Sequence, residues 1–255
     1  EADGRDDGNL GQHDVGRVKP TAKARLDDGD VAALARELPD VAIECGAIAD
    51  DSLRQTDLIA ISPGIDRRMP AIAGAIARGT PVAGDVELFA QALPQLKSKP
   101  RVIAITGTNG KSTVTTLVAR MARRAGLAAR AGGNLGPPAL DLLDGTDVDL
   151  FVLELSSYQL ESTTSLELVA AAVLNLTPDH LDRYGDMAAY GAAKARIFAR
   201  CGTAVVNADD DAVRRMPQPG QRRLAFSLHE AADADYRLLR NEGRWWLAQG
   251  GERLL

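Results

Sequence analysis

The stretch Ile105-Thr-Gly-Thr-Asn-Gly-Lys-Ser-Thr113 decides the fold of this chain. It follows an apolar run, Val102–Ile105, and it opens an amphipathic run from Val114 to Met121. The order of strand, glycine-rich turn and helix suits a phosphate group. Glycine lets the backbone approach an anion closely. The free N–H groups and the positive dipole end of the helix then face that anion.

The loop is a variant of the Walker A pattern, which has four residues between its two glycines. Here Gly107 and Gly110 enclose two residues, and Ile105 stands where the first glycine of the full pattern would be. A glycine turn with a solvated lysine is the alternative interpretation. Lysine adds a point charge, and the hydroxyls that follow it can reach Mg²⁺. The predicted nucleotide-contacting residues are Gly107, Thr108, Asn109, Gly110, Lys111, Ser112 and Thr113.

Composition indicates an ordinary globular protein. The 255 residues are 45% hydrophobic and 25% charged, enough for one large domain or two modest ones. The net charge of -5 gives no reason to expect nucleic acid as a partner. We see no apolar run of membrane-spanning length and no signal peptide. Cys45 and Cys201 are far apart and are expected to be free thiols, so we predict a cytoplasmic protein without membrane insertion.

Strand–helix alternation predicts an α/β fold in two parts. Residues 1–28 are rich in Asp and Gly and are expected to be irregular or disordered. Residues 29–95 contain candidate strands at Val41–Cys45 and Asp57–Ser62, and a short one that begins at Val82. A polar, proline-bracketed connection at Pro94–Pro100 predicts a domain boundary, after which residues 96–255 form the second domain.

The second domain is predicted to have a mostly parallel sheet that ends in a β-hairpin. Buried strands are expected at Leu150–Leu155, Val169–Asn175 and Thr203–Asn207. The hairpin is expected between Tyr236 and Ala248, with glycine in its turn.

Several polar residues fall where predicted strands end, which is where ligands bind in open α/β sheets. Glu154 closes an apolar strand, and a buried carboxylate is costly unless it is paired or bound to a metal. Mg²⁺ is therefore one expected partner of Glu154, and a cap or an ion pair is the other. From the residues alone, His180 is as well explained as a hydrogen-bonded loop residue, and Lys194 as a solvated lysine.

A set of longer stretches resembles the muramyl ligases of peptidoglycan synthesis. The resemblance covers about residues 30–255. The stretches are Ser62–Ile65, Gly84–Phe89, Ala104–Thr116, Gly132–Gly136, Leu153–Leu160, Leu176–Tyr184, Ala193–Phe198 and Val206–Asp209. The phosphate loop is shared by all these ligases and by the folate polyglutamate synthetases. The stretch Glu154-Leu-Ser-Ser-Tyr-Gln159 favours the branch that adds D-glutamate to UDP-N-acetylmuramoyl-L-alanine.

The resemblance implies an ATP- and Mg²⁺-dependent ligase that acts through an acyl phosphate, as a monomer. Lys111 would hold the β- and γ-phosphates, and Ser112 and Thr113 would contact phosphate or Mg²⁺. Glu154 would bind Mg²⁺, His180 would lie at a second metal, and Lys194 matches a lysine that the family carries as a metal-binding carbamate. Lys111, His180 and Lys194 are thus the predicted catalytic residues.

The same resemblance assigns the substrate contacts. Residues 29–95 would be a partial Rossmann-like domain for the UDP part, and residues 96–255 an ATP-binding central domain that is incomplete at its C-terminal end. The predicted contacts of the UDP part are Ser62, Pro63 and Gly64. Those of the muramoyl-alanine part are Asn134, Ser156, Gln159 and His180.

The chain departs from the family pattern at both ends. Residues 1–28 contain no strand with a glycine-rich turn, and no third domain follows the predicted hairpin. A truncated ligase with weak or no activity is therefore expected, since no lid would close over the site. The alternatives are a catalytically incompetent module that binds a nucleotide or UDP-sugar, and a ligase of this or the folylpolyglutamate type that adds another amino acid.

Overall fold

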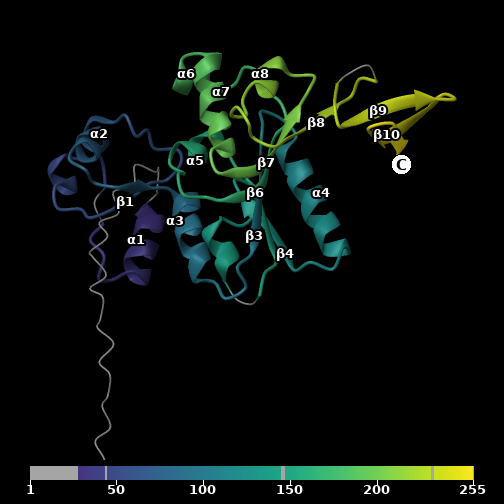
Figure 1. Cartoon of the computed structure of the whole chain (residues 1–255). Coiled ribbons are helices and arrows are strands. Elements are labelled where there is room, and N and C mark those ends of the chain that lie inside the picture. Colours follow the sequence, from purple (N-terminus) through teal and green to yellow (C-terminus); the bar gives the residue numbers. More distant parts are fainter. Residues whose placement is uncertain (1–27, 44, 145–146, 231–232, 255) are drawn as a thin grey trace, which may run out of the picture. The chain divides into compact units, whose positions relative to one another are not determined.

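The computed structural model describes residues 28–43, 45–144, 147–230 and 233–254 (Figure 1). Its contacts divide the chain into two compact units: the first contains the described residues up to Ile59 together with Ile65–Pro81, and the second contains Ala60–Gly64 and everything from Val82 onward. The predicted irregular segment 1–28 lies outside the described residues, apart from Asp28, which begins a helix. The domain boundary at residues 95–96 stays a prediction.

The first unit is mainly helical. It contains α1 (Asp28–Glu37), the 3₁₀ helix η1 (Asp51–Leu53) and α2 (Pro70–Ala77). The short strands β1 (Ile59–Ala60) and β2 (Val82–Ala83) pair with each other in a two-stranded sheet.

The two longer strands predicted in this region fared differently. The strand predicted at Asp57–Ser62 is reduced to β1. The strand predicted at Val41–Cys45 is wrong, because the described residues 41–43 and 45 form none. An alternating apolar run becomes a strand only where a neighbouring strand can pair with it.

The second unit is built on a nine-stranded sheet in the order β11-β10-β9-β8-β7-β6-β3-β5-β4. Neighbours from β4 to β9 run parallel, and β9, β10 and β11 run antiparallel. The predicted parallel sheet and C-terminal hairpin are confirmed. The strands are β3 (Arg101–Thr106), β4 (Ala129–Gly133), β5 (Leu150–Glu154), β6 (Leu168–Val173), β7 (Cys201–Asn207), β8 (Arg223–Ser227), β9 (Tyr236–Asn241), β10 (Arg244–Gln249) and β11 (Glu252–Arg253).

Helices cover both faces of the parallel part, α4 on one side and α3 on the other (Figure 1). Parallel strands are typically buried in this way, and every residue of β5 is buried. The helices are α3 (Asp85–Ala92), η2 (Leu93–Gln95), α4 (Lys111–Arg124), η3 (Leu140–Leu143), α5 (Ser157–Glu161), α6 (Leu181–Tyr184), α7 (Met187–Ala195), η4 (Arg196–Phe198) and α8 (Asp211–Arg214). None of these helices, nor any other that the structure describes, is long and apolar enough to cross a membrane.

The core has two layers because β3 alternates its side chains between the faces of the sheet. Ile103 and Ile105 pack on the α4 side. Val102 and Ala104 pack on the other side, where Phe89 of α3 meets the Phe151 ring edge-on with centroids 5.1 Å apart. This packing fixes the strands so that β3, β5 and β6 all end at one edge of the sheet.

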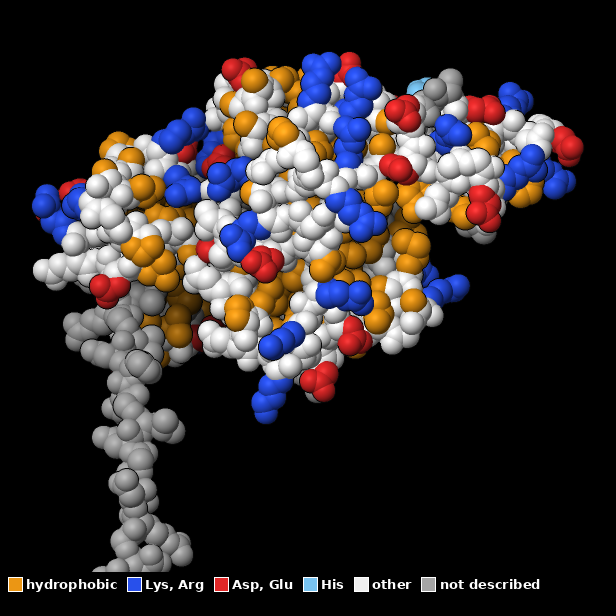
Figure 2. All heavy atoms as spheres, in the orientation of Figure 1, with side chains coloured by type: hydrophobic (Ala, Val, Ile, Leu, Met, Phe, Trp, Pro, Cys, Tyr) orange, Lys and Arg blue, Asp and Glu red, His pale blue; other side chains and the backbone are white. Residues whose placement is uncertain are grey.

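The surface mixes charges of both signs. Acidic and basic side chains are interspersed on the face shown in Figure 2, which agrees with the modest net charge of -5. Of the hairpin tryptophans, Trp245 is exposed and Trp246 is half-buried, as expected for neighbours on opposite faces of a strand.

Candidate active site

The phosphate loop lies between β3 and α4, as predicted. Gly107 has φ +154°, and a Cβ there would lie 3.1 Å from the Leu174 side chain, so the position requires glycine. Gly110 has φ +81° and immediately precedes α4. No side chain caps the start of α4, so its first N–H groups remain available to an anion.

The segment after β6 holds the loop in place. The backbone N–H of Asn109 donates to Oδ1 of Asn175 at 2.8 Å, and Nδ2 of Asn175 donates back to the Asn109 carbonyl at 3.0 Å. The Thr108 hydroxyl accepts from the backbone N–H of Thr177 at 3.0 Å. The loop is therefore fixed from its neighbouring strand as well as from its own helix.

Two lysines meet at one backbone carbonyl of the loop. Lys111 Nζ donates to the carbonyls of Gly107 at 3.0 Å and Thr108 at 2.8 Å. Lys194 Nζ, from α7, donates to the same Gly107 carbonyl at 2.9 Å. The predicted catalytic lysines thus come together, although they are far apart in the sequence.

Lys194 is not the solvated lysine that composition alone favoured. Its side chain is 2% exposed, and its ammonium lies 4.7 Å from the centre of the Tyr190 ring. Burial, and then the charge of Lys111, lower the pKa of Lys194 to about 8, against a smaller opposing effect of Asp179. Among the described residues, no carboxylate lies within ion-pair distance of Lys194.

Glu154 ends β5 beside the loop, paired in register with Ile105 of β3. It is 2% exposed, and its Oε1 accepts from Nδ2 of Asn134 at 2.7 Å. Its Oε2 is buried and has no hydrogen-bond partner in the part of the chain that the structure describes. A buried carboxylate oxygen without a partner is costly, so the position is suited to a cation.

No described group of His, Cys, Asp and Glu side chains could hold a metal by itself. Mg²⁺ is commonly bound by one or two carboxylates together with the phosphates of a nucleotide. Glu154 beside a phosphate loop fits that mode of binding.

The other predicted site residues lie outside the phosphate loop. His180 is exposed and has φ +52°, and its ring lies 5.0 Å from the Tyr158 ring and 6.1 Å from the Tyr190 ring, centre to centre. Ser156 caps α5, and its hydroxyl accepts from the backbone N–H of Gln159. Ser62, Pro63 and Gly64 follow β1 within the second unit.

Sequence reasoning missed several residues that hold the site. Tyr190 links His180 to the loop, because its hydroxyl lies 3.4 Å from that of Thr108. Asp85 and Glu87 begin α3 directly after β2, so the rule that ligands bind at strand ends could have identified them.

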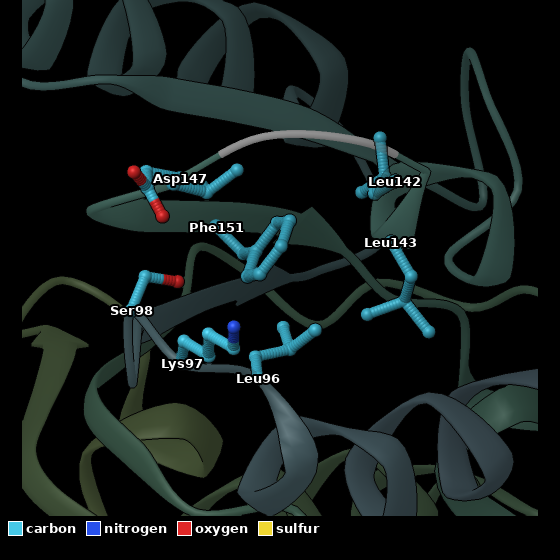
Figure 3. Close-up of a pocket in the computed structure, with 8 residues that line it drawn as sticks. Leu96, Lys97, Ser98, Leu142, Leu143, Asp147 and Phe151 are labelled. Carbon is cyan, nitrogen blue, oxygen red and sulfur yellow. The ribbon is translucent and has the colours of Figure 1, made fainter.

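Two cavities among the described residues lie away from the phosphate loop. One, of about 140 Å³, is lined by residues that precede β3 and β5, at the opposite end of those strands; Leu96, Leu142 and Phe151 form its apolar wall (Figure 3). The other, of about 180 Å³, is lined by the end of α5, the segment that follows it, and η4.

Comparisons with known proteins agree with this geometry. Residues 105–244 match the Mur ligase middle domain, and residues 20–84 match the Mur ligase MurD-like N-terminal domain. The chain is 49% identical over 225 residues to a UDP-N-acetylmuramoylalanine–D-glutamate ligase from Nitrosococcus oceani, covering 88% of this chain and 49% of that protein. It is 48% identical to the protein of the same name from Methylobacillus flagellatus, with 88% and 49% covered. The chain thus spans about half the length of the curated relatives it matches.

Solved structures show the same fold at lower identity. A UDP-N-acetylmuramoyl-L-alanyl-D-glutamate–2,6-diaminopimelate ligase superposes with a TM-score of 0.56 at 23% identity, covering 79% of this chain and 53% of that one. A UDP-N-acetylmuramoylalanyl-D-glutamyl-2,6-diaminopimelate–D-alanyl-D-alanyl ligase from Acinetobacter baumannii gives 0.52 at 19% identity, with 80% and 53% covered. With its middle domain matched across most of the second unit, the chain belongs to the Mur ligase family.

Proposed function

We propose that the chain supplies the ATP site, and part of the UDP-substrate site, of a ligase that adds D-glutamate to UDP-N-acetylmuramoyl-L-alanine. The observation that carries the proposal is Oε2 of buried Glu154, which has no partner among the described residues and belongs to the residue that ends the strand beside the phosphate loop. The relatives at 48–49% identity carry the name of that reaction.

The proposed reaction has two steps. A carboxylate oxygen of the substrate attacks the γ-phosphorus of ATP, the bond to the bridging oxygen of ADP breaks, and an acyl phosphate forms. The amine of D-glutamate then attacks the acyl carbon, loses a proton and expels inorganic phosphate. Such chemistry depends mainly on positioning and on neutralising charge, which this site can supply.

The residues have distinct roles in this proposal. Lys111 leaves the carbonyls of its own loop and binds the β- and γ-phosphates, while the N–H groups at the start of α4 bind the same anion. Glu154 and Ser112 would help to hold Mg²⁺, which would neutralise the phosphate charge. Asn134, Ser156, Gln159 and His180 face the muramoyl-alanine part, and Ser62, Pro63 and Gly64 face the UDP part.

Lys194 is proposed to act as a carbamate. A pKa of about 8 leaves roughly one side chain in ten neutral at pH 7, far more than for an ordinary lysine. A neutral amine can attack the carbon of CO₂ and lose a proton, and the carbamate that forms is an anion that could bind Mg²⁺. His180 is proposed to lie at a second metal, and a monomer in the cytoplasm remains the expectation.

Isothermal titration of the 255-residue chain with Mg-ATP tests the nucleotide site. Lys111→Ala should weaken binding by about a hundredfold, because a charge-assisted contact with phosphate is lost. Lys97→Ala is the matched control, since it removes an exposed lysine from the other end of the sheet. Equal binding by the Lys111 variant and the control contradicts the assignment of the loop.

A second assay separates the alternatives. Phosphate release is measured with UDP-N-acetylmuramoyl-L-alanine and, in turn, D-glutamate, meso-diaminopimelate and L-alanine. Release that depends on D-glutamate supports the proposal. Mg-ATP binding without any release favours a non-catalytic binding module, and release with another amino acid favours a different member of the family.

A further inference from the structure

The α5 segment, residues 156–165, carries two of the proposed substrate contacts, Ser156 and Gln159. Charged side chains from elsewhere in the second unit hold it in place. Asp85 and Glu87 lie in the first turn of α3, and Arg196 begins η4. None of the three has a role in the reaction described above.

Asp85 acts on Ser156 through the amide of Gln159. The Gln159 Nε2 group donates to Oδ2 of Asp85 at 3.0 Å. Its Oε1 accepts from the backbone N–H of Ser156 at 3.1 Å and lies 3.4 Å from the Ser156 hydroxyl. That hydroxyl in turn accepts from the backbone N–H of Gln159 at 3.1 Å.

The carboxylate decides which way the amide faces. An ionised carboxylate only accepts hydrogen bonds, so the NH₂ group of Gln159 must face Asp85 and its oxygen must face Ser156. If the amide turned over, its NH₂ group would meet the backbone N–H of Ser156, donor against donor. The direction of the Ser156 hydroxyl therefore depends on a residue about 70 positions away in the sequence.

Glu87 and Arg196 hold the other end of the segment by its backbone. Glu87 Oε2 accepts from the N–H groups of Thr164 at 2.6 Å and Ser165 at 3.0 Å. Arg196 donates to the carbonyls of Leu160 at 2.7 Å and Thr163 at 3.1 Å. Leu160, Thr163 and Thr164 of this segment also line the cavity of about 180 Å³.

We propose that Asp85 is a positioning residue for the UDP-muramoyl substrate: it fixes the amide of Gln159, and thereby the Ser156 hydroxyl, in the orientation that receives the substrate. The inference rests on the proposed function of this site. The second oxygen of Asp85, Oδ1, is buried and has no partner among the described residues, so the carboxylate does not serve stability alone.

A reciprocal exchange tests the proposal. Asp85→Asn lets the amide of Gln159 turn over, and Gln159→Glu sets a second carboxylate against Asp85. The double variant D85N/Q159E restores the contact with its direction reversed: the amide introduced at position 85 donates to the carboxylate introduced at position 159, whose other oxygen still accepts from Ser156. A glutamate at that position of a capping box is favourable.

Binding of UDP-N-acetylmuramoyl-L-alanine is measured by isothermal titration, with Mg-ATP titrated against the same variants. The Gln159→Glu variant should bind the UDP substrate about tenfold or more weakly, and Asp85→Asn about three- to tenfold more weakly. The double variant should return to within about threefold of the original chain, and Mg-ATP binding should change by less than about twofold throughout. Asp141→Asn, an exposed carboxylate in η3, is the matched control.

The outcomes are distinct. Single variants that bind like the control overturn the proposal. So does a double variant as weak as the two losses combined, because binding would then not depend on the contact between positions 85 and 159. A purely structural role would weaken both ligands together.

Failure of the proposed function is recognised separately, as a chain that binds no UDP-N-acetylmuramoyl-L-alanine even before mutation. Amide hydrogen exchange at Ser156 and Gln159 then decides the positioning role without any ligand. Each single variant should exchange faster at both amides and the double variant should be protected again; unchanged exchange in Asp85→Asn overturns the inference.

Discussion

The first turn of α3 and the end of β5 each carry a buried glutamate, and the two side chains are satisfied very differently. Glu87 is 4% exposed and accepts hydrogen bonds on both oxygens, from Thr164 and Ser165 on one and from Gln91 on the other. Glu154 is 2% exposed, yet one of its oxygens has no partner among the described residues. Two glutamates of similar burial are therefore satisfied in opposite ways: the hydrogen bonds of Glu87 stabilise the fold, whereas Glu154 costs stability and is proposed to serve Mg²⁺ binding.

The largest expected effect is on folding. Glu87→Gln should lower the free energy of unfolding by about 2–3 kcal/mol at pH 7, because the amide keeps only one acceptor oxygen: the bonds from the backbone N–H groups lose their charge assistance, and the new NH₂ group faces the Nε2 donor of Gln91. Urea unfolding measures this. The control is Glu167→Gln, whose exposed ion pair with Arg200 should be worth about 0–1 kcal/mol. If Glu87→Gln loses no more unfolding free energy than Glu167→Gln, Glu87 does not stabilise the fold and does not differ from Glu154 in this respect.

The pH dependence of the free energy of unfolding tests whether Glu87 stabilises the fold through its ionised form. Burial alone would raise the pKa of Glu87, but the N–H groups of Ser165 and Thr164 and the side-chain donors outweigh it and lower the pKa from 4.5 to about 2. A group whose pKa is lowered by folding stabilises the protein above its unfolded pKa and loses that effect as the pH falls. The difference between the original chain and Glu87→Gln should thus be constant above about pH 5 and shrink between about pH 4.5 and 2. A difference that stays constant down to pH 2 contradicts the role of the ionised form.

Glu154→Gln should behave in the opposite way. The free energy of unfolding should stay within about 1 kcal/mol of the original or rise, because an uncompensated buried charge is removed. The enhancement of ATP binding by Mg²⁺, measured by titration with and without the ion, should fall about tenfold. A destabilisation as large as that of Glu87→Gln, with Mg²⁺ enhancement intact, would make Glu154 structural.

The smallest effect concerns Asn134, the side-chain donor to Glu154 among the described residues. Asn134→Ala removes a 2.7 Å hydrogen bond and should cost about 1 kcal/mol. In the Glu154→Gln background the cost should be about half, since a neutral acceptor makes a weaker bond. A double-mutant cycle by urea unfolding measures the difference. Equal costs in both backgrounds would indicate that Asn134 acts elsewhere.

The sequence predicted the parts of the site that are local. Strand, glycine turn, lysine and helix are contiguous in Ile105–Thr113, so their order alone predicts the loop between β3 and α4. The parallel sheet followed from continuous apolar runs such as Leu150–Leu155, which form strands buried on both faces. These predictions needed no knowledge of which strands are neighbours.

Contacts between distant segments could not be predicted. Lys194 reaches the Gly107 carbonyl only because α7 packs beside the loop, and its alanine-rich helix gives no sign of this. Asn134 was predicted to contact substrate, and that stays a prediction; what the structure shows is that its Nδ2 donates to Glu154. Asp85 accepts a hydrogen bond from Gln159, and the sequence gives no sign that the two residues are neighbours in space. Each of these depends on the spatial order of strands, which short-range patterns leave open.

The central place of β3 has a consequence for how the chain is made. Both of its neighbours, β5 and β6, come later in the sequence, and Thr106 does not meet Val173 until 67 further residues have been added. At roughly 5–20 residues per second, a ribosome would leave the apolar strand Arg101–Thr106 with two open edges for several seconds. Unpaired strand edges attract other chains. The strand that carries the phosphate loop is therefore expected to be open to wrong pairing while the chain is being made.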